Sequence, residues 1–379
     1  MKRVILLLET SREFGRQLIF GVVRYSNLHG PWSFFKEPID LESAIPRLTG
    51  WHPDGIIMRD SLITKELFKL KVPTIFSVHT FSYPKNLPLI LTDDFAVGKM
   101  ASEHLVEKGF KNFAFCGFDA YVWSNDRKLS FCRFNDEAGY QTHIYATPKK
   151  VKNYDWEKEQ RHVSEWIKSL PKPIGIFACN DDRGHHVLDA CKFAGFRVPE
   201  DVAVIGVDND PMVCGLEDPP LTSIALSVES AGYEAAKLLD QLMNGKRMKG
   251  QRIIINPSHV IQRQSSDILA VSDPEVGSAI RFIKENAKKK ILVKDVLQST
   301  TISRRTLEQR FRKSLHRSIY SQIRRVRVEM ISKLLLETNL SVSQITSLFD
   351  FTDIEHISRY FKKEKGMGLY RFRKVHQPH

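Results

Sequence analysis

The sequence has few of the features that mark secreted, membrane-spanning or zinc-binding proteins. Its five cysteines are an odd number without a Cys-x-x-Cys pair, so reduced thiols in a cytoplasmic protein are expected, and disulfide or zinc scaffolding is disfavoured. No apolar run approaches the roughly 18 residues of a membrane span. The first apolar run covers only residues 4–8 before charge returns, which is too short for a signal peptide and predicts a buried strand.

Motifs of nucleotide binding and of common catalytic sites are also missing. No Gly-x-Gly-x-x-Gly follows the first predicted strand, and neither a phosphate-binding loop nor a Gly-x-Ser-x-Gly motif occurs. His185 and His186 are adjacent, which on a helix points them about 100° apart and suits joint metal ligation poorly. We therefore expect no enzyme, no cofactor and no metal.

What the sequence does have is an uneven charge distribution. The chain has 379 residues, enough for two or three domains. Residues 272–379 carry 23 Lys and Arg against 11 Asp and Glu, whereas residues 1–271 carry 34 against 33, so +12 of the net charge of +13 lies in the last part. Such concentration is typical of a domain that binds nucleic-acid phosphates. We place the domain boundary near residues 272–274, giving domains 1–271 and 272–379.

Two segments of similar design lie in the basic part, at residues 303–313 and 353–363. Each starts with a Ser or Asp able to cap a helix and has two apolar residues four positions apart for a buried face. The outward faces carry Arg305, Gln309 and Arg312 in the first segment, and Glu355, Arg359 and Lys363 in the second. Taken alone, each fits an ordinary solvated surface helix. Each also follows another short helical pattern, at 291–302 and 340–351, and these pairs predict two helix-turn-helix units.

Residues 273–374 resemble the DNA-binding domain of AraC/XylS-type transcription regulators, in which a linker helix joins two helix-turn-helix units. The matching segments are SRRTLEQRFRK, IRRVRVEMISKLLLET and LSVSQITSLFDFTDIEHISRYFKKEKG. There are two departures: the family usually has Gly where Asp350 stands, and a closing Pro-x-x-Tyr-Arg where this chain has residues 369–373. Asp tolerates a left-handed backbone better than most residues, so the first departure is mild.

The resemblance implies recognition helices at about 303–314 and 353–365, a linker helix at 318–338, and double-stranded operator DNA as partner. The candidate DNA-binding residues are Arg304, Arg305, Gln309, Arg312, Glu355, His356, Arg359, Lys362 and Lys363. We expect Arg305, Gln309, His356 and Arg359 to contact bases, and Arg312, Lys362 and Lys363 to contact phosphates. The run at 288–290 fits either a phosphate contact or a helix C-terminus.

The first 263 residues alternate between apolar runs and helical patterns. The runs lie at 4–8, 55–58, 74–78, 89–92, 113–118, 174–179 and 202–207, and the helical stretches at 14–27, 95–108, 156–169, 183–194 and 230–244. This alternation predicts an α/β fold with parallel sheets. Ligands of such folds bind outside the carboxyl ends of the strands.

The residues after those runs are polar or aromatic in an orderly way. They are Glu9, Ser11, Phe14, Arg16, Arg59, Asp60, Asp93, Asp94, Trp123, Arg127, Asn180, Asp181, Asp182, Asp208 and Asn209, with a loop expected around residues 119–130. Carboxylates and an arginine beside aromatic rings suit a polyhydroxylated ligand. Individually, each Asp or Asn also fits a turn or a helix cap.

Residues 3–265 resemble the effector-binding domain of LacI/GalR-type repressors, notably at NDD (180–182) and IGVDND (205–210). The resemblance implies a two-lobed, periplasmic-binding-protein-like sensor with its effector in the cleft. By position, Asp93, Arg127, Asp181 and Asp208 match places that often line that cleft. Phe14, Arg16, Asp60 and Trp123 complete the candidate effector-binding set.

Together, these features predict a sugar-responsive transcription regulator. A sensor of this type followed by this DNA-binding domain resembles regulators of pentose utilisation, which implies a pentose effector, D-xylose, and an activator. We expect a cytoplasmic homodimer without membrane contact, with RNA polymerase as a candidate partner. The alternative is a carbohydrate-binding sensor or enzyme of α/β fold whose basic tail binds RNA or another protein.

Overall fold

The computed structural model describes residues 1–35, 51–59, 71–78, 87–146, 156–246, 250–268, 273–315 and 317–376. Contacts divide the chain into two compact units, Met1–Ile268 and Leu269–His379. The sequence predicts the domain boundary near residues 272–274. Residues 269–272 lie outside the described residues, so only 273 and 274 of that boundary are described.

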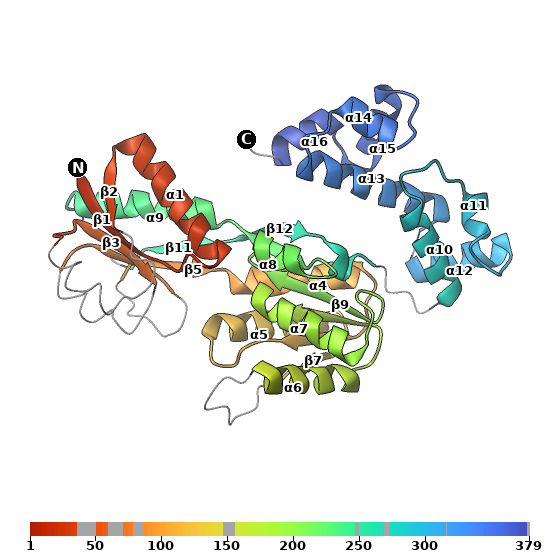
Figure 1. Ribbon diagram of the computed structural model, residues 1–379, viewed down its shortest axis with the longest axis horizontal. Coiled ribbons are helices and arrows are strands. Elements are labelled where there is room, and N and C mark those ends of the chain that lie inside the picture. The colour runs from red at the N-terminus through yellow and green to blue at the C-terminus, as the bar shows by residue number, and fades with distance from the viewer. Residues whose placement is uncertain are drawn as a thin grey trace. The chain divides into compact units, whose positions relative to one another are not determined.

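The first lobe of the first unit is built on a six-stranded sheet in the order β11-β5-β4-β3-β1-β2. Its strands are β1 (Lys2–Leu7), β2 (Trp32–Phe35), β3 (Gly55–Arg59), β4 (Thr74–Ser77), β5 (Leu89–Thr92) and β11 (Arg252–Ile255), all paired in parallel. Helices α1 (Glu13–His29) and α9 (Val228–Met243) lie side by side against it (Figure 1). A Cβ at Gly21 would lie 2.0 Å from the Glu229 carbonyl oxygen, and one at Gly232 would lie 2.1 Å from that of Leu18. Glycine is therefore required where these two helices meet.

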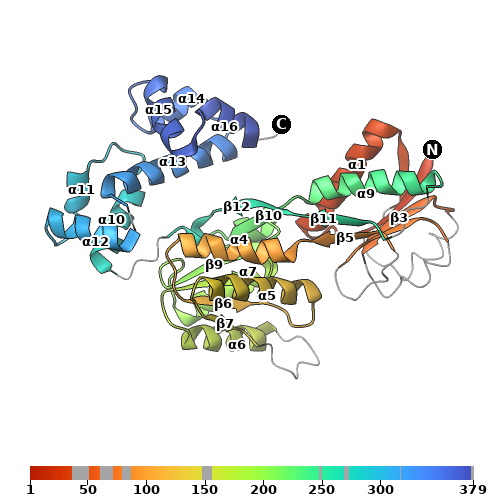
Figure 2. The ribbon, with the colours of Figure 1, turned by 180° about the vertical axis from the view of Figure 1, so that it is seen from behind.

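The second lobe has a six-stranded sheet in the order β12-β10-β9-β8-β6-β7. Its strands are β6 (Phe113–Cys116), β7 (Thr142–Ile144), β8 (Ile174–Ala178), β9 (Val202–Val207), β10 (Thr222–Leu226) and β12 (Pro257–Ile261). Helices α4 (Asp94–Glu107) and α5 (Val122–Glu137) cover one face, and α6 (Trp156–Ser169) and α7 (Asp181–Ala194) cover the other (Figure 2). Because helices cover both faces, every residue of β8 and β9 is buried, which explains their uninterrupted apolar sequences.

The two lobes are joined where the chain passes between them after β5, after β10 and after β11. These crossings are bonded to one another: the Asp93 amide donates to the Ile255 carbonyl at 2.9 Å, and the Ser227 amide donates to the Asn256 carbonyl at 2.9 Å. The crossings thus form one joint between the lobes.

The α/β fold predicted from the sequence is confirmed, with two corrections. The sheets are parallel except at β12, which pairs antiparallel with β10. The expected loop around residues 119–130 is largely helix, because α5 begins at Val122. Its polar sequence has no continuous apolar stripe, so periodicity did not reveal it.

The second unit is all helical. It contains α10 (Pro274–Glu285), α11 (Val293–Leu297), α12 (Arg304–Leu315), α13 (Ile319–Glu337), α14 (Val342–Leu348), α15 (Ile354–Lys365) and α16 (Leu369–His376). Helix α13 takes part in two separate cores. Its first half packs Ile323 and Val326 with α10 and α12, and its second half packs Ile331 and Leu335 with α14 and α15. The unit therefore consists of two helix-turn-helix subdomains that share helix α13.

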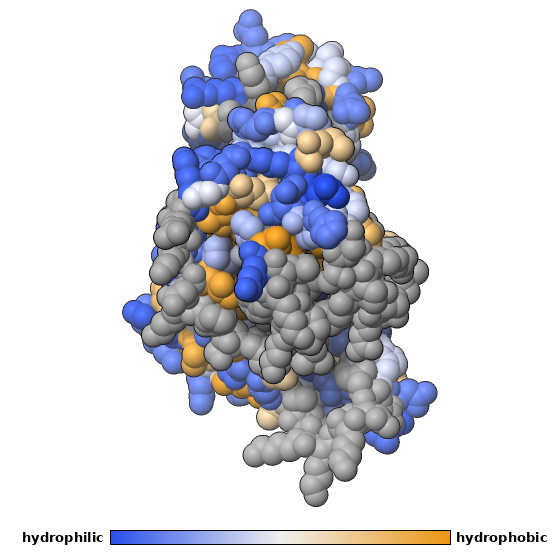
Figure 3. Space-filling view, turned by 90° about the vertical axis from the view of Figure 1, so that its left-hand side faces the viewer, coloured by the Kyte–Doolittle hydropathy of each residue, from blue (hydrophilic) through white to orange (hydrophobic). Residues whose placement is uncertain are grey.

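On the side of the molecule drawn in Figure 3, apolar side chains of described residues form small separate areas among hydrophilic ones. None of the described helices is long and apolar enough to cross a membrane.

Candidate functional site

A cavity of about 1120 Å³ lies between the two lobes of the first unit. Its walls come from the carboxyl ends of strands in both sheets and from the loops that follow them, as expected for parallel sheets. They include Glu9 after β1, Arg59 at the end of β3, Phe118 after β6, Asn180 after β8 and Asp208 after β9.

A buried charged group forms the second lobe's part of the cavity. The Arg127 Nε donates to Asp94 at 2.7 Å, and its Nη1 donates to the Cys179 carbonyl at 2.6 Å. Burial opposes the charge of Arg127, but the carboxylates of Asp94 and Asp208 outweigh it and raise the pKa of the guanidinium. Burial raises the pKa of Asp208 to about 6. Asp208 also has a positive φ of 101°, so the backbone itself turns sharply at this strand end.

Aromatic rings lie next to this charged group. The Arg127 guanidinium carbon is 4.9 Å from the centre of the Trp123 ring, and Trp123 stacks on Tyr121 with centres 5.5 Å apart. Phe14 and Phe118 also line the cavity. Fixed hydrogen-bonding groups beside flat apolar faces can hold a sugar by its hydroxyls and its C–H face.

The predicted effector-binding residues divide into three groups. Phe14, Trp123, Arg127 and Asp208 line the cavity; Arg16, Asp93 and Asp181 are not part of its lining; and Asp60 lies outside the described residues. The structure thus brings half of the predicted set together.

Asp93 and Asp181 have other partners. Asp93 caps α4 by accepting the Ala96 amide at 2.9 Å, and the next residue, Asp94, lines the cavity in its place. Asp181 points into the second lobe, where it accepts the Ser223 hydroxyl at 2.6 Å and the Asp210 amide at 2.8 Å. Burial is the largest cause that raises the pKa of Asp181, to about 8. The sequence places both residues at strand ends but does not show which way each side chain points.

Arg16 joins the lobes beside the cavity instead of lining it. Its Nη2 donates to Asp210 of the second lobe at 3.1 Å, and the Glu13 amide donates to the same carboxylate at 2.8 Å. The neighbouring Arg12 donates to Asp182 at 2.9 Å. We call these contacts of Arg12, Glu13 and Arg16 with Asp182 and Asp210 the interlobe latch.

Some lining residues were not proposed as effector ligands from the sequence. Arg12, Tyr121, Asp182 and His186 line the cavity. Asp182 and His186 lie four residues apart on α7, so the helical period that places them on one face was the available signal.

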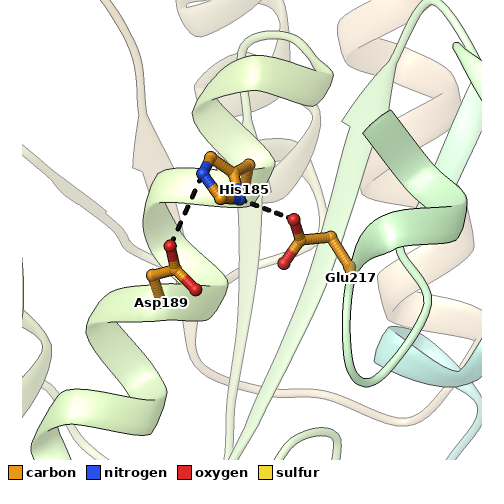
Figure 4. Close-up of side chains that lie close together, drawn as sticks. All are labelled: His185, Asp189 and Glu217. Carbon is orange, nitrogen blue, oxygen red and sulfur yellow. Dashed lines mark hydrogen bonds and ion pairs between the residues drawn. The ribbon is translucent and has the colours of Figure 1, made fainter. Parts of the chain in front are cut away.

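His185, next to His186, belongs to a separate polar cluster at the far end of α8 (Pro211–Leu216) (Figure 4). Its Nδ1 lies 2.5 Å from Glu217, and its Nε2 lies 3.5 Å from Asp189. Lys192 lies 3.4 Å from Asp189 and 3.9 Å from Glu217. A metal could use these groups only by displacing existing partners, because both ring nitrogens face a carboxylate and Lys192 adds positive charge. We interpret the cluster as an ion-pair network.

The second unit presents two exposed basic helices, α12 and α15. Ser303 accepts the Thr306 amide at 3.3 Å and Asp353 accepts the His356 amide at 2.6 Å, so the two predicted caps are confirmed. The predicted apolar anchors, Leu307, Phe311, Ile357 and Phe361, are fully buried. The predicted DNA-binding residues Arg304, Arg305, Gln309, Arg312, Glu355, His356, Arg359, Lys362 and Lys363 are all exposed.

The exposed residues differ in whether their side chains form ion pairs or hydrogen bonds within the protein. Arg304 pairs with Glu308 at 2.9 Å, whereas the Arg305 side chain has no ion pair or hydrogen bond with any described residue. Asp350, where the family usually has Gly, has a φ of 53°, so the predicted left-handed turn of the second helix-turn-helix is confirmed. The segment with the altered closing motif forms α16.

Comparisons with known proteins agree with this two-part organisation. Residues 102–266 match a periplasmic binding protein-like domain, and residues 297–374 match a helix-turn-helix domain. The chain is 31% identical to the xylose operon regulatory protein of Escherichia coli, over 95% of this chain and 94% of that one. It is 33% identical to the protein of the same name from Haemophilus influenzae, over 98% of each.

A solved structure of the xylose-binding transcription activator XylR is similar over 99% of this chain and 98% of that one, with a TM-score of 0.69 and 30% identity. A LacI-type regulator from Alkaliphilus metalliredigens shares the fold of the first unit, with a TM-score of 0.55 and 22% identity over 70% of this chain and 99% of that one. The extent and identity of these matches show that the chain belongs to the family of xylose operon regulatory proteins.

Proposed function

We propose that this chain is a cytoplasmic transcription activator of pentose-utilisation genes, with D-xylose as its effector. The observation that carries the proposal is the cavity in which Arg127, Asp94 and Asp208 lie beside the ring of Trp123. Its polar groups are fixed by burial and by one another, as a site for sugar hydroxyls requires. The relatives named for xylose operons support the choice of a pentose.

In this proposal, the sugar acts by favouring the closed arrangement of the two lobes. A sugar that touches both lobes binds the closed state more tightly than the open one, and this difference in affinity shifts the equilibrium. Closure changes how two protomers of a homodimer are arranged, and so changes the spacing of their DNA-binding units. The proposal assigns no catalytic step to the cavity.

In the proposed DNA complex, α12 and α15 enter successive major grooves, about 34 Å apart. Arg305, Gln309, His356 and Arg359 contact base edges, because they are exposed on the outer faces of these helices. We assign Arg304, Arg312, Lys362 and Lys363, which are exposed, to phosphate contacts, and Glu355 is exposed on α15. RNA polymerase is the proposed partner of the activated complex.

The test is calorimetric titration of the full chain with a panel of pentoses and hexoses, followed by gel shifts on the DNA upstream of the chain's own coding sequence. We expect D-xylose to bind more tightly than the hexoses and to change the shifted complex. DNA binding that is equal on unrelated DNA and unaffected by every sugar would contradict the proposal. It would favour a sensor with a basic tail for RNA or another partner.

A further inference from the structure

A buried arginine lies where the two helix-turn-helix subdomains meet. Arg327 is in the middle of α13, between the half that packs on α10 and α12 and the half that packs on α14 and α15. Only 5% of Arg327 is exposed. A charge with so little contact with water is costly unless other groups compensate for it.

The partners of Arg327 come from both helix-turn-helix subdomains. Its Nη1 donates to the carbonyl oxygen of Lys289, between α10 and α11. Its Nη2 donates to the carbonyl oxygen of Phe349 at 2.5 Å, at the end of α14. The single guanidinium thus bonds to the backbone of the first subdomain and to that of the second.

Aromatic rings, rather than a carboxylate, surround the charge. The guanidinium carbon lies 5.7 Å from the ring centre of Phe349 and 5.0 Å from that of Phe351. Burial lowers the pKa of Arg327, against the opposing effects of Tyr360, which is also hydrogen-bonded to the side chain, and of Asp350. The side chain forms no ion pair with any described carboxylate. The guanidinium is therefore held by the two carbonyls, the two rings and Tyr360 of α15, and its position constrains these groups in turn.

We propose that Arg327 is a positioning residue that sets the separation and orientation of α12 and α15. The two carbonyls belong to different subdomains, so the planar fork of donors can bond to both only when the two subdomains have one relative placement. A lysine keeps the charge and has three donors, but its compact ammonium lacks the planar fork that fixes the direction of each carbonyl. The consequence for DNA binding rests on the proposed function, whereas the effect on the protein alone does not.

The first test measures the protein without DNA. Spin labels are attached to full-length chain carrying Ser314→Cys in α12 and Ser343→Cys in α14, both exposed, with Cys132→Ser to remove the one cysteine that is not buried. We expect Arg327→Lys to broaden the distribution of label distances. The control is Arg325→Lys, the same change two residues away, where Arg325 pairs with Glu329 on its own helix at 2.9 Å. Equal widths in the two variants would overturn the proposal.

Circular dichroism of each variant first establishes that its helices are intact. If Arg327→Lys unfolds the unit, Arg327→Gln replaces it, because the amide still donates to one carbonyl without a buried charge. We expect the same broadening from it, and an unchanged width would again overturn the proposal.

The second test uses DNA from upstream of the chain's own coding sequence, with both contacted segments intact or with either one randomised. Two linked modules gain affinity only when their spacing allows both to bind, so Arg327→Lys should lose about tenfold on intact DNA and much less on DNA with one segment. An equal loss on all three DNAs would show a general folding defect and contradict positioning. If the wild type fails to bind any of them, the proposed function fails while the spin-label result stands.

Discussion

At the scale of single residues, neighbouring histidines on α7 show how local partners shift pKa values in opposite directions. Glu217 raises the pKa of His185 through a hydrogen bond, against the effect of burial. Burial, followed by repulsion from Arg183, lowers the pKa of His186 to about 3. His186, which lines the cavity, is therefore neutral at physiological pH, whereas Glu217 stabilises the protonated form of His185.

We predict that Glu217→Gln lowers the pKa of His185 in the folded protein. The pair stabilises the fold below the unfolded histidine pKa of about 6.5, and this contribution is lost as pH rises through the higher folded value. Titration of the histidine ring signals by NMR measures the shift, and denaturant unfolding at several pH values measures the stability. Asp189→Asn serves as the control and should lower the pKa less, since Glu217 is the larger cause. An unchanged pKa in Glu217→Gln would refute the assignment.

Arg305 is a candidate for base contact whose exposed side chain has no ion pair or hydrogen bond with any described residue. We predict that Arg305→Ala weakens binding to operator DNA by about 1–3 kcal/mol, the range of a good base contact, with much less effect on random DNA. Competition gel shifts give both affinities. Arg310→Ala is the control, since Arg310 lies on the same helix but pairs with Asp273 at 3.4 Å. Equal weakening on operator and random DNA would assign Arg305 to a phosphate contact.

At the scale of elements, the turn between α14 and α15 depends on a non-glycine residue in the left-handed region. Asp350 has a φ of 53°, which a β-branched residue adopts only at a cost of about 1–2 kcal/mol. We predict that Asp350→Val lowers the free energy of unfolding by about that amount, and that Asp350→Gly does not lower it. Denaturant unfolding of the full chain checks both. A Val variant as stable as the Gly variant would show that the turn rearranges.

The elements also show which parts of the molecule the sequence could reveal. Continuous apolar runs identified β8 and β9, because strands buried on both faces leave no polar positions. Helix α5 was missed, although it carries both Trp123 and Arg127. The sequence therefore identified two residues that line the cavity, but not the helix that holds them.

Direction of side chains is what the sequence could not supply at the site. Asp93 and Asp94 are adjacent carboxylates after the same strand, and only the start of α4 decides that the first caps the helix and the second faces Arg127. At the start of α7, Asp181 is likewise turned away from the cavity, toward Ser223, whereas Asp182 lines it. Strand-end position predicts that a residue is near the cavity, and helix phase decides whether it points in.

At the scale of the whole molecule, the interlobe latch joins the two lobes beside the cavity in which we propose that the sugar binds. Asp210 is buried and accepts both the Arg16 guanidinium and the Glu13 amide of the other lobe. The Asp181 carboxylate accepts a hydrogen bond from the Asp210 amide. The predicted effector residues that do not line the cavity thus include two, Arg16 and Asp181, that bond to Asp210 where the lobes meet.

Arg16→Met should weaken sugar binding although Arg16 is not part of the cavity wall. Loss of the contact with Asp210 makes closure less favourable, and the apparent affinity falls with the population of the closed state. A loss of about 1–2 kcal/mol in closure, as for one charge-assisted contact, corresponds to about 5–30-fold weaker binding. Calorimetric titration with D-xylose gives the dissociation constant. Arg24→Met is the matched control, since Arg24 lies on the same helix but pairs with Glu229 within its own lobe at 3.2 Å. If both variants bind the sugar as tightly as the wild type, the latch does not contribute to closure, and the energy for closing comes from the sugar's own contacts with Arg127 and its neighbours.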